Sequence, residues 1–165
     1  MKRIIAISIL CASVMPAAHA EEQAENYVGV SASKLIATPS STGAGVVLGH
    51  RYNEHLAAEI AYEDSGALSA APDRTTALSV AVLGFVPLYG EFEGFARVGY
   101  ASAHSKDATG VTANHGDVTY GAGIEYHLND KYSVDLGWNR LRIGDNVGIP
   151  RGNENSYVLT VLRSF

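Results

Sequence analysis

Hydrophobic and polar residues alternate with a period of two through most of the chain, a pattern that predicts β-strands rather than helices. In one segment Leu56, Ala58, Ile60 and Tyr62 share one face, and Ala57, Glu59, Ala61 and Glu63 share the other. The alternation predicts eight strands separated by turns: Tyr27–Ser33, Gly43–Arg51, Leu56–Glu63, Thr75–Phe85, Phe92–Ala101, Asp117–Tyr126, Tyr132–Leu141 and Tyr157–Phe165.

The two faces of these strands favour a membrane barrel over a soluble one. One face carries large apolar side chains, whereas the other is small, glycine-bearing or charged. The second face cannot form a packed core, so we assign it to a lumen and the apolar face to lipid. The expected fold is therefore all-β, an eight-stranded antiparallel up-and-down transmembrane barrel. A soluble β-sandwich with one wet face is the alternative.

The predicted connections alternate in length, as periplasmic turns and external loops do in outer-membrane barrels. The short ones are Tyr52–His55, Val86–Glu91 and His127–Lys131. The longer ones are Lys34–Thr42, Asp64–Arg74, Ser102–Gly116 and Ile143–Ser156.

Aromatic residues near the strand ends predict two interfacial girdles, with members Tyr52, Tyr62, Phe85, Tyr100, Tyr126, Tyr132 and Trp138. Tyr27 is the exception, because its place in the alternation points it inward.

The N-terminal residues have the pattern of a secretory signal peptide. Lys2 and Arg3 precede an apolar stretch, and Ala18 and Ala20 form the small-x-small pattern of a cleavage site. We expect cleavage after Ala20, with residues 1–20 as the signal and 21–165 as one barrel domain. The apolar stretch falls short of the ~20 residues of a transmembrane anchor. Cys11, the single cysteine, lies inside the signal, so the mature chain has no disulfide.

Three segments resemble the OmpA-like transmembrane-domain family: Gly49–Glu59 (GHRYNEHLAAE), Gly94–Tyr100 (GFARVGY) and Gly121–Asp130 (GAGIEYHLND). Their order spans essentially the whole mature chain. The resemblance implies a monomeric eight-stranded barrel in the outer membrane of a double-membraned bacterium. No residues follow Phe165 that could form the peptidoglycan-binding domain of longer members, so we expect no peptidoglycan anchoring.

The C-terminal strand has the alternation expected of a barrel-assembly signal, carried by Tyr157, Leu159, Val161 and Phe165. The expected partners during biogenesis are the barrel-assembly machinery and periplasmic chaperones. Arg163 departs from the usual apolar residue at the third position from the end. We expect its stem to reach the lipid headgroups from the lipid-facing side.

Charge excludes one class of partner and suggests the content of the lumen. Without Lys2 and Arg3, ten basic residues face 17 acidic ones, a net charge of −7 that argues against nucleic acid. Alternation predicts inward charges at Arg51, Glu59, Glu63, Arg97, Glu125 and Asp135. Because charges inside a narrow barrel must pair, we expect a salt-bridge network that plugs the lumen. A gate in a narrow solute path is the alternative.

Catalytic and metal-binding patterns are sparse. None of the five histidines of the mature chain is spaced as a metal pair, and no cofactor is expected. His104, Ser105 and Asp107 form the only local cluster suited to nucleophilic hydrolysis, on a predicted loop. We therefore expect that the protein is not an enzyme.

The main hypothesis is a structural or surface-interaction barrel, surrounded by lipopolysaccharide, whose external loops carry any host contact. A porin-like channel and an enzyme acting on lipid or peptide are the alternatives.

Overall fold

The computed structural model describes residues 24–36, 41–65, 74–106, 112–143 and 152–165. They form eight strands: β1 (Glu25–Ile36), β2 (Ser41–Asn53), β3 (Leu56–Asp64), β4 (Arg74–Pro87), β5 (Phe92–Lys106), β6 (Thr112–Asn129), β7 (Tyr132–Ile143) and β8 (Gly152–Ser164). Among these described residues, no helix is long and apolar enough to cross a membrane. The predicted signal peptide, with Ala18 and Ala20, lies outside the described residues.

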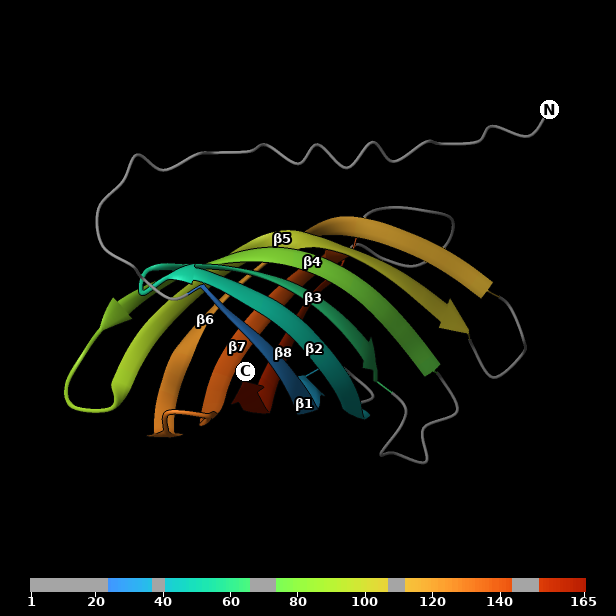
Figure 1. Ribbon diagram of the computed structural model, residues 1–165. Coiled ribbons are helices and arrows are strands. Elements are labelled where there is room, and N and C mark those ends of the chain that lie inside the picture. The colour runs from blue at the N-terminus through green and yellow to red at the C-terminus, as the bar shows by residue number, and fades with distance from the viewer. Residues whose placement is uncertain (1–23, 37–40, 66–73, 107–111, 144–151) are drawn as a thin grey trace.

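The strands close into a single antiparallel barrel, as the alternation predicted. Each strand pairs with the next in the sequence, and β8 returns to pair with β1 (Figure 1). The seam runs from Tyr27 opposite Ser164 to Ile36 opposite Asn155. The Phe165 backbone extends it, since its N–H donates to the Asn26 carbonyl at 2.9 Å. Closure leaves no open sheet edge, which a bilayer would not tolerate.

Side chains alternate between lumen and lipid as predicted. In β3, Ile60 is 53% exposed whereas the neighbouring Glu59 is 6% exposed. The outward positions of all eight strands carry an apolar band that includes Val30, Leu48 and Val80. A water-soluble barrel would bury such residues. The outer surface therefore matches lipid.

Several strands are longer than the sequence predicted, mainly where they meet the long loops. The predicted loop Ser102–Gly116 is wrong over most of its length, because β5 continues to Lys106 and β6 starts at Thr112. The register is unbroken there, with His104 opposite Asn114. The small and polar composition of this segment suggested a loop, but strands above the membrane can pair with polar side chains facing water.

Two of the short turns are stabilised by an asparagine that follows a register shift. Asn53 accepts a hydrogen bond from the His55 N–H at 2.9 Å, and Asn129 accepts one from the Lys131 N–H at 2.9 Å. The shifts fall at Arg51/Asn53 and His127/Asn129. Asparagine favours such turns because its side chain bonds to backbone two residues on.

The structure places six of the seven predicted girdle residues outward, and one prediction was wrong. Tyr52, Tyr62, Tyr100, Tyr126 and Tyr132 are exposed, and Trp138 packs edge-on against outward-facing Tyr120. Phe85 instead faces the lumen and is 6% exposed. Strand-end position suggested an outward ring, but Phe85 shares its face with inward Leu83 and Ala81. Alternation, rather than distance from the turn, decides the side.

Large apolar side chains also fill part of the lumen. Tyr27, Val47, Leu83, Phe85, Phe95 and Leu162 form a buried cluster inside the barrel. Glycines on neighbouring strands make room for the rings. A Cβ added to Gly123 would lie 2.5 Å from the Phe95 ring and 2.5 Å from the Leu136 carbonyl oxygen. The Phe95 ring therefore depends on the missing side chain at Gly123.

This packing predicts that Gly123→Ala destabilises the barrel by about 1–3 kcal/mol, the usual cost of overpacking. Gly84→Ala is the matched control, since its added Cβ would face lipid with its nearest contact at 3.9 Å. Urea unfolding in lipid vesicles measures both. Equal stability of Gly123→Ala and Gly84→Ala would contradict the tight ring–glycine contact.

Candidate functional site: the charged lumen

The ion pairs inside the described part of the barrel fall into two groups. The first, the central pair, is Arg97 with Glu59 and lies near the middle of the barrel. The second, the mouth cluster, is Arg51, Glu93, Glu125 and His127 and lies at the end with the short turns. Both groups arise because alternation directs odd-numbered positions of β2, β3, β5 and β6 inward.

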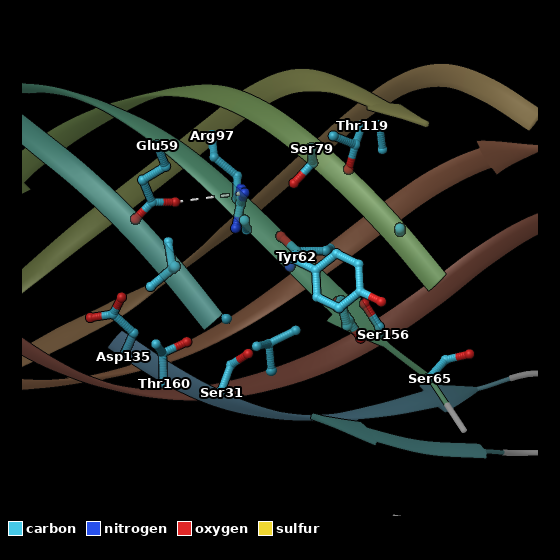
Figure 2. Close-up of a pocket in the computed structure, with 18 of the residues that line it drawn as sticks. Ser31, Glu59, Tyr62, Ser65, Ser79, Arg97, Thr119, Asp135, Ser156 and Thr160 are labelled. Atoms are coloured by element: carbon cyan, nitrogen blue, oxygen red, sulfur yellow. Dashed lines mark ion pairs between the residues drawn. The ribbon is translucent and has the colours of Figure 1, made fainter. Parts of the chain in front are cut away.

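In the central pair, the Glu59 carboxylate has a partner for each oxygen. An Arg97 guanidinium nitrogen lies 3.6 Å from Oε2, and the Tyr27 hydroxyl donates to Oε1 at 3.0 Å. Figure 2 shows Arg97 and Glu59 facing each other inside the barrel, with a dashed line for their ion pair. Glu59 is buried, so these contacts replace the water that a buried charge loses.

The mouth cluster joins side chains from three strands. Arg51 of β2 forms an ion pair with Glu93 of β5, and its other terminal nitrogen lies 3.9 Å from Glu125 of β6. The guanidinium also stacks on Phe85, 4.1 Å from the ring centroid. His127 contacts both acids, with Nε2 at 3.2 Å from Glu93 and Nδ1 at 3.9 Å from Glu125.

Two of the six predicted lumen charges are not joined to an arginine within the described part of the chain. Glu63 instead accepts a hydrogen bond from the Ser33 hydroxyl. Asp135 is 9% exposed, and its Oδ1 has no hydrogen-bond partner among the described residues. The structure thus places all six predicted charges in the lumen, but joins only Arg51, Glu59, Arg97 and Glu125 by ion pairs.

Sequence reasoning missed Glu93 and His127, although the alternation carried a signal for both. Glu93 lies four residues before Arg97 and His127 two residues after Glu125, so each shares the inward face of its strand. Glu93 lies inside the predicted strand Phe92–Ala101, whereas His127 is the first residue of the predicted turn His127–Lys131. Tyr27 was expected to point inward, but its hydrogen bond to Glu59 on a distant strand could not be read from sequence.

Within the part of the barrel that the structure describes, side chains separate an outer cavity of the lumen from a mouth cavity. The outer cavity, about 130 Å³, lies toward the long loops and is lined by hydroxyl groups such as those of Ser79, Thr119 and Ser156 (Figure 2). The mouth cavity, about 420 Å³, is lined by Arg51, Glu125 and His127 among others. Glu59 and Asp135 line both cavities, so they mark the partition between them.

The proposed assembly residues lie together on the outer face of β8. Tyr157, Leu159, Val161 and Phe165 are all exposed to the surrounding lipid. Arg163 is exposed on the same face. This arrangement presents an apolar strand surface.

Comparison with solved structures shows the same fold. The N-terminal β-barrel domain of Pseudomonas aeruginosa OprF has a TM-score of 0.67 at 14% identity, with 87% of this chain and 100% of that one covered. Neisserial surface protein A has a TM-score of 0.66 at 11% identity, covering 86% and 97%. Yersinia pestis Ail, solved with the heparin analogue sucrose octasulfate, has a TM-score of 0.58 at 10% identity, covering 86% and 97%.

A sequence search of curated proteins found no significant match. The model of the outer membrane protein beta-barrel domain family, however, matches residues 4–165. That match agrees with the closed barrel and its apolar outer band, and it places the protein in the outer membrane. Outer-membrane barrels have their long loops on the external side and their short turns on the periplasmic side. The chain belongs to the outer membrane protein beta-barrel domain family.

Proposed function

We propose that this protein is a sealed outer-membrane barrel with a structural and surface-interaction role. The observation that carries the proposal is the blocked middle of the lumen. There the central pair and the buried apolar rings lie between the outer cavity and the mouth cavity. An eight-stranded barrel is just wide enough for its side chains to fill. The charges inside then serve to hold strands together across the lumen rather than to conduct.

The external side supports the surface-interaction part of the proposal. Tyr100 lies in the outer girdle, and beyond it β5 continues for six residues, about 20 Å of strand, paired with β6. His104 and Asn114 on this hairpin share a hydrogen bond of 2.5 Å. The paired strands form a stiff extension beyond the girdle. Lipopolysaccharide would surround its base, and a host or surface ligand would meet its tip.

A sealed, structural lumen predicts that Arg97→Ala destabilises the barrel strongly. The change leaves Glu59 buried without its cation, which typically costs about 3–5 kcal/mol. Urea unfolding in lipid vesicles measures the loss. Glu59→Gln in the same chain should recover part of it, because the unpaired charge is then removed. Arg163→Ala, on the lipid face, should cause no such loss. Wild-type stability of Arg97→Ala would contradict a structural role for the pair.

A narrow solute channel is the second candidate, favoured by the two cavities that meet at Glu59 and Asp135. Side chains alone separate them, so a rearrangement could join them. The sealed barrel predicts no steady single-channel conductance in planar bilayers. A wild-type conductance that rises in Arg51→Ala, and stays unchanged in the lipid-facing control Arg163→Ala, would instead establish the channel.

We propose further that the protein is not an enzyme. His104 is exposed and bonds to Asn114. Asp107 and the Ser105 side chain lie outside the described part of the structure. A general base needs a fixed nucleophile within reach. The test is hydrolysis of lipid and peptide substrates by the purified barrel, where no turnover is expected. Turnover that His104→Ala abolishes would contradict this proposal.

A further inference from the structure

The mouth cluster has more acid than the described cations neutralise. Glu93, Glu125 and Asp135 occupy one row on three adjacent strands, since Glu93 lies opposite Glu125 and Glu125 lies opposite Asp135. Like charges placed directly opposite on neighbouring strands repel each other. Among the described residues, Arg51 is the one permanently charged cation paired with this row, through Glu93 and Glu125, while His127 contacts the same two acids. The row therefore holds three acidic side chains against one guanidinium.

Three side chains of this region have the chemistry and the proximity of metal ligands. One ligand atom each from Glu93, Glu125 and His127 lie within 4.8 Å of one another. Ligands bound to zinc at about 2.0–2.2 Å in a tetrahedron are about 3.4 Å apart. Closing the largest separation therefore takes about 1.4 Å, which two flexible glutamate side chains can share. An imidazole with carboxylates suits zinc and similar transition metals better than calcium or magnesium.

A second, independent observation also points to a bound cation. Asp135, the third acid of the row, is 9% exposed, and its Oδ1 has no hydrogen-bond partner among the described residues. It lines the same cavity of about 420 Å³ as Glu125 and His127. A buried carboxylate oxygen without a partner is costly. A nearby cation, or water bound to it, would supply the missing interaction.

We propose that Glu93, Glu125 and His127 bind one Zn²⁺ ion at the periplasmic mouth of the barrel, with Asp135 beside the bound ion. The dication neutralises the charge that Arg51 leaves uncompensated. Glu125 presents Oε2 toward Arg51 and Oε1 toward His127, so the metal and the guanidinium approach it from different sides. Arg51 also contacts the Glu93 oxygen nearest His127, which makes it a competitor for the metal.

The test is isothermal titration of Zn²⁺ into the full mature barrel, refolded in detergent at neutral pH and checked by its heat-modifiable electrophoretic mobility. The expected result is one ion per chain. His127→Ala should weaken binding at least about tenfold. His50→Ala is the matched control, since His50 lies at the same end of the barrel but outside the lumen, bonded to Asn26. His127→Gln provides a second variant if His127→Ala does not fold.

Arg51→Gln separates this site from nonspecific binding to acidic groups. Removing the competing positive charge should tighten Zn²⁺ binding, and Zn²⁺ should also raise the unfolding temperature of wild type but not of His127→Ala. The proposal is overturned if wild type binds no Zn²⁺, if His50→Ala weakens binding as much as His127→Ala, or if Arg51→Gln weakens binding. These outcomes leave the sealed-barrel proposal untouched, because conductance tests that separately.

Discussion

Lipid offers no hydrogen-bond partner to the backbone, and this constraint determines the rest of the structure. Every N–H and C=O in the membrane must find a partner within the chain, so the sheet must close. The seam between β1 and β8 achieves closure, and the Phe165 backbone extends it to Asn26. Closure with eight strands then fixes a narrow interior, because barrel diameter follows strand number. Inward-facing side chains must therefore fit that narrow interior, and any charges among them must find partners inside it.

The interior meets this demand by two different means. Near the middle and the mouth, apolar rings such as Phe85 and Phe95 fill space above glycines and alanines of neighbouring strands. The second means is charge pairing, in which Arg97 and Arg51 neutralise acids contributed by other strands. The arginines act across the lumen, whereas the sheet hydrogen bonds act only between neighbours. Charge pairing therefore ties together strands that the backbone ladder does not connect directly.

The fold could be predicted from sequence because alternation, turn residues and the aromatic strand ends all depend on local spacing. The same spacing placed Tyr27 and the six lumen charges correctly inside. Two predictions were wrong. Phe85 lies at a strand end like the girdle residues, but its side chain follows the inward alternation. The loop Ser102–Gly116 is shorter than predicted, because paired strands extend beyond the membrane. Partner choice could not be predicted, because Arg51 reaches Glu93 across the lumen, from β2 to β5. That contact depends on the closed shape of the barrel.

The single tryptophan of the chain, Trp138, gives the most direct test of the central claim that the apolar face meets lipid. It lies on the outward face of β7, in the predicted outer girdle, against Tyr120. The measurement is quenching of its fluorescence in vesicles whose lipids carry bromine at different depths. Strong quenching is expected in the folded barrel, greatest for bromine near the headgroups. Absence of quenching at every depth would place Trp138 away from lipid and contradict the assignment of the two faces.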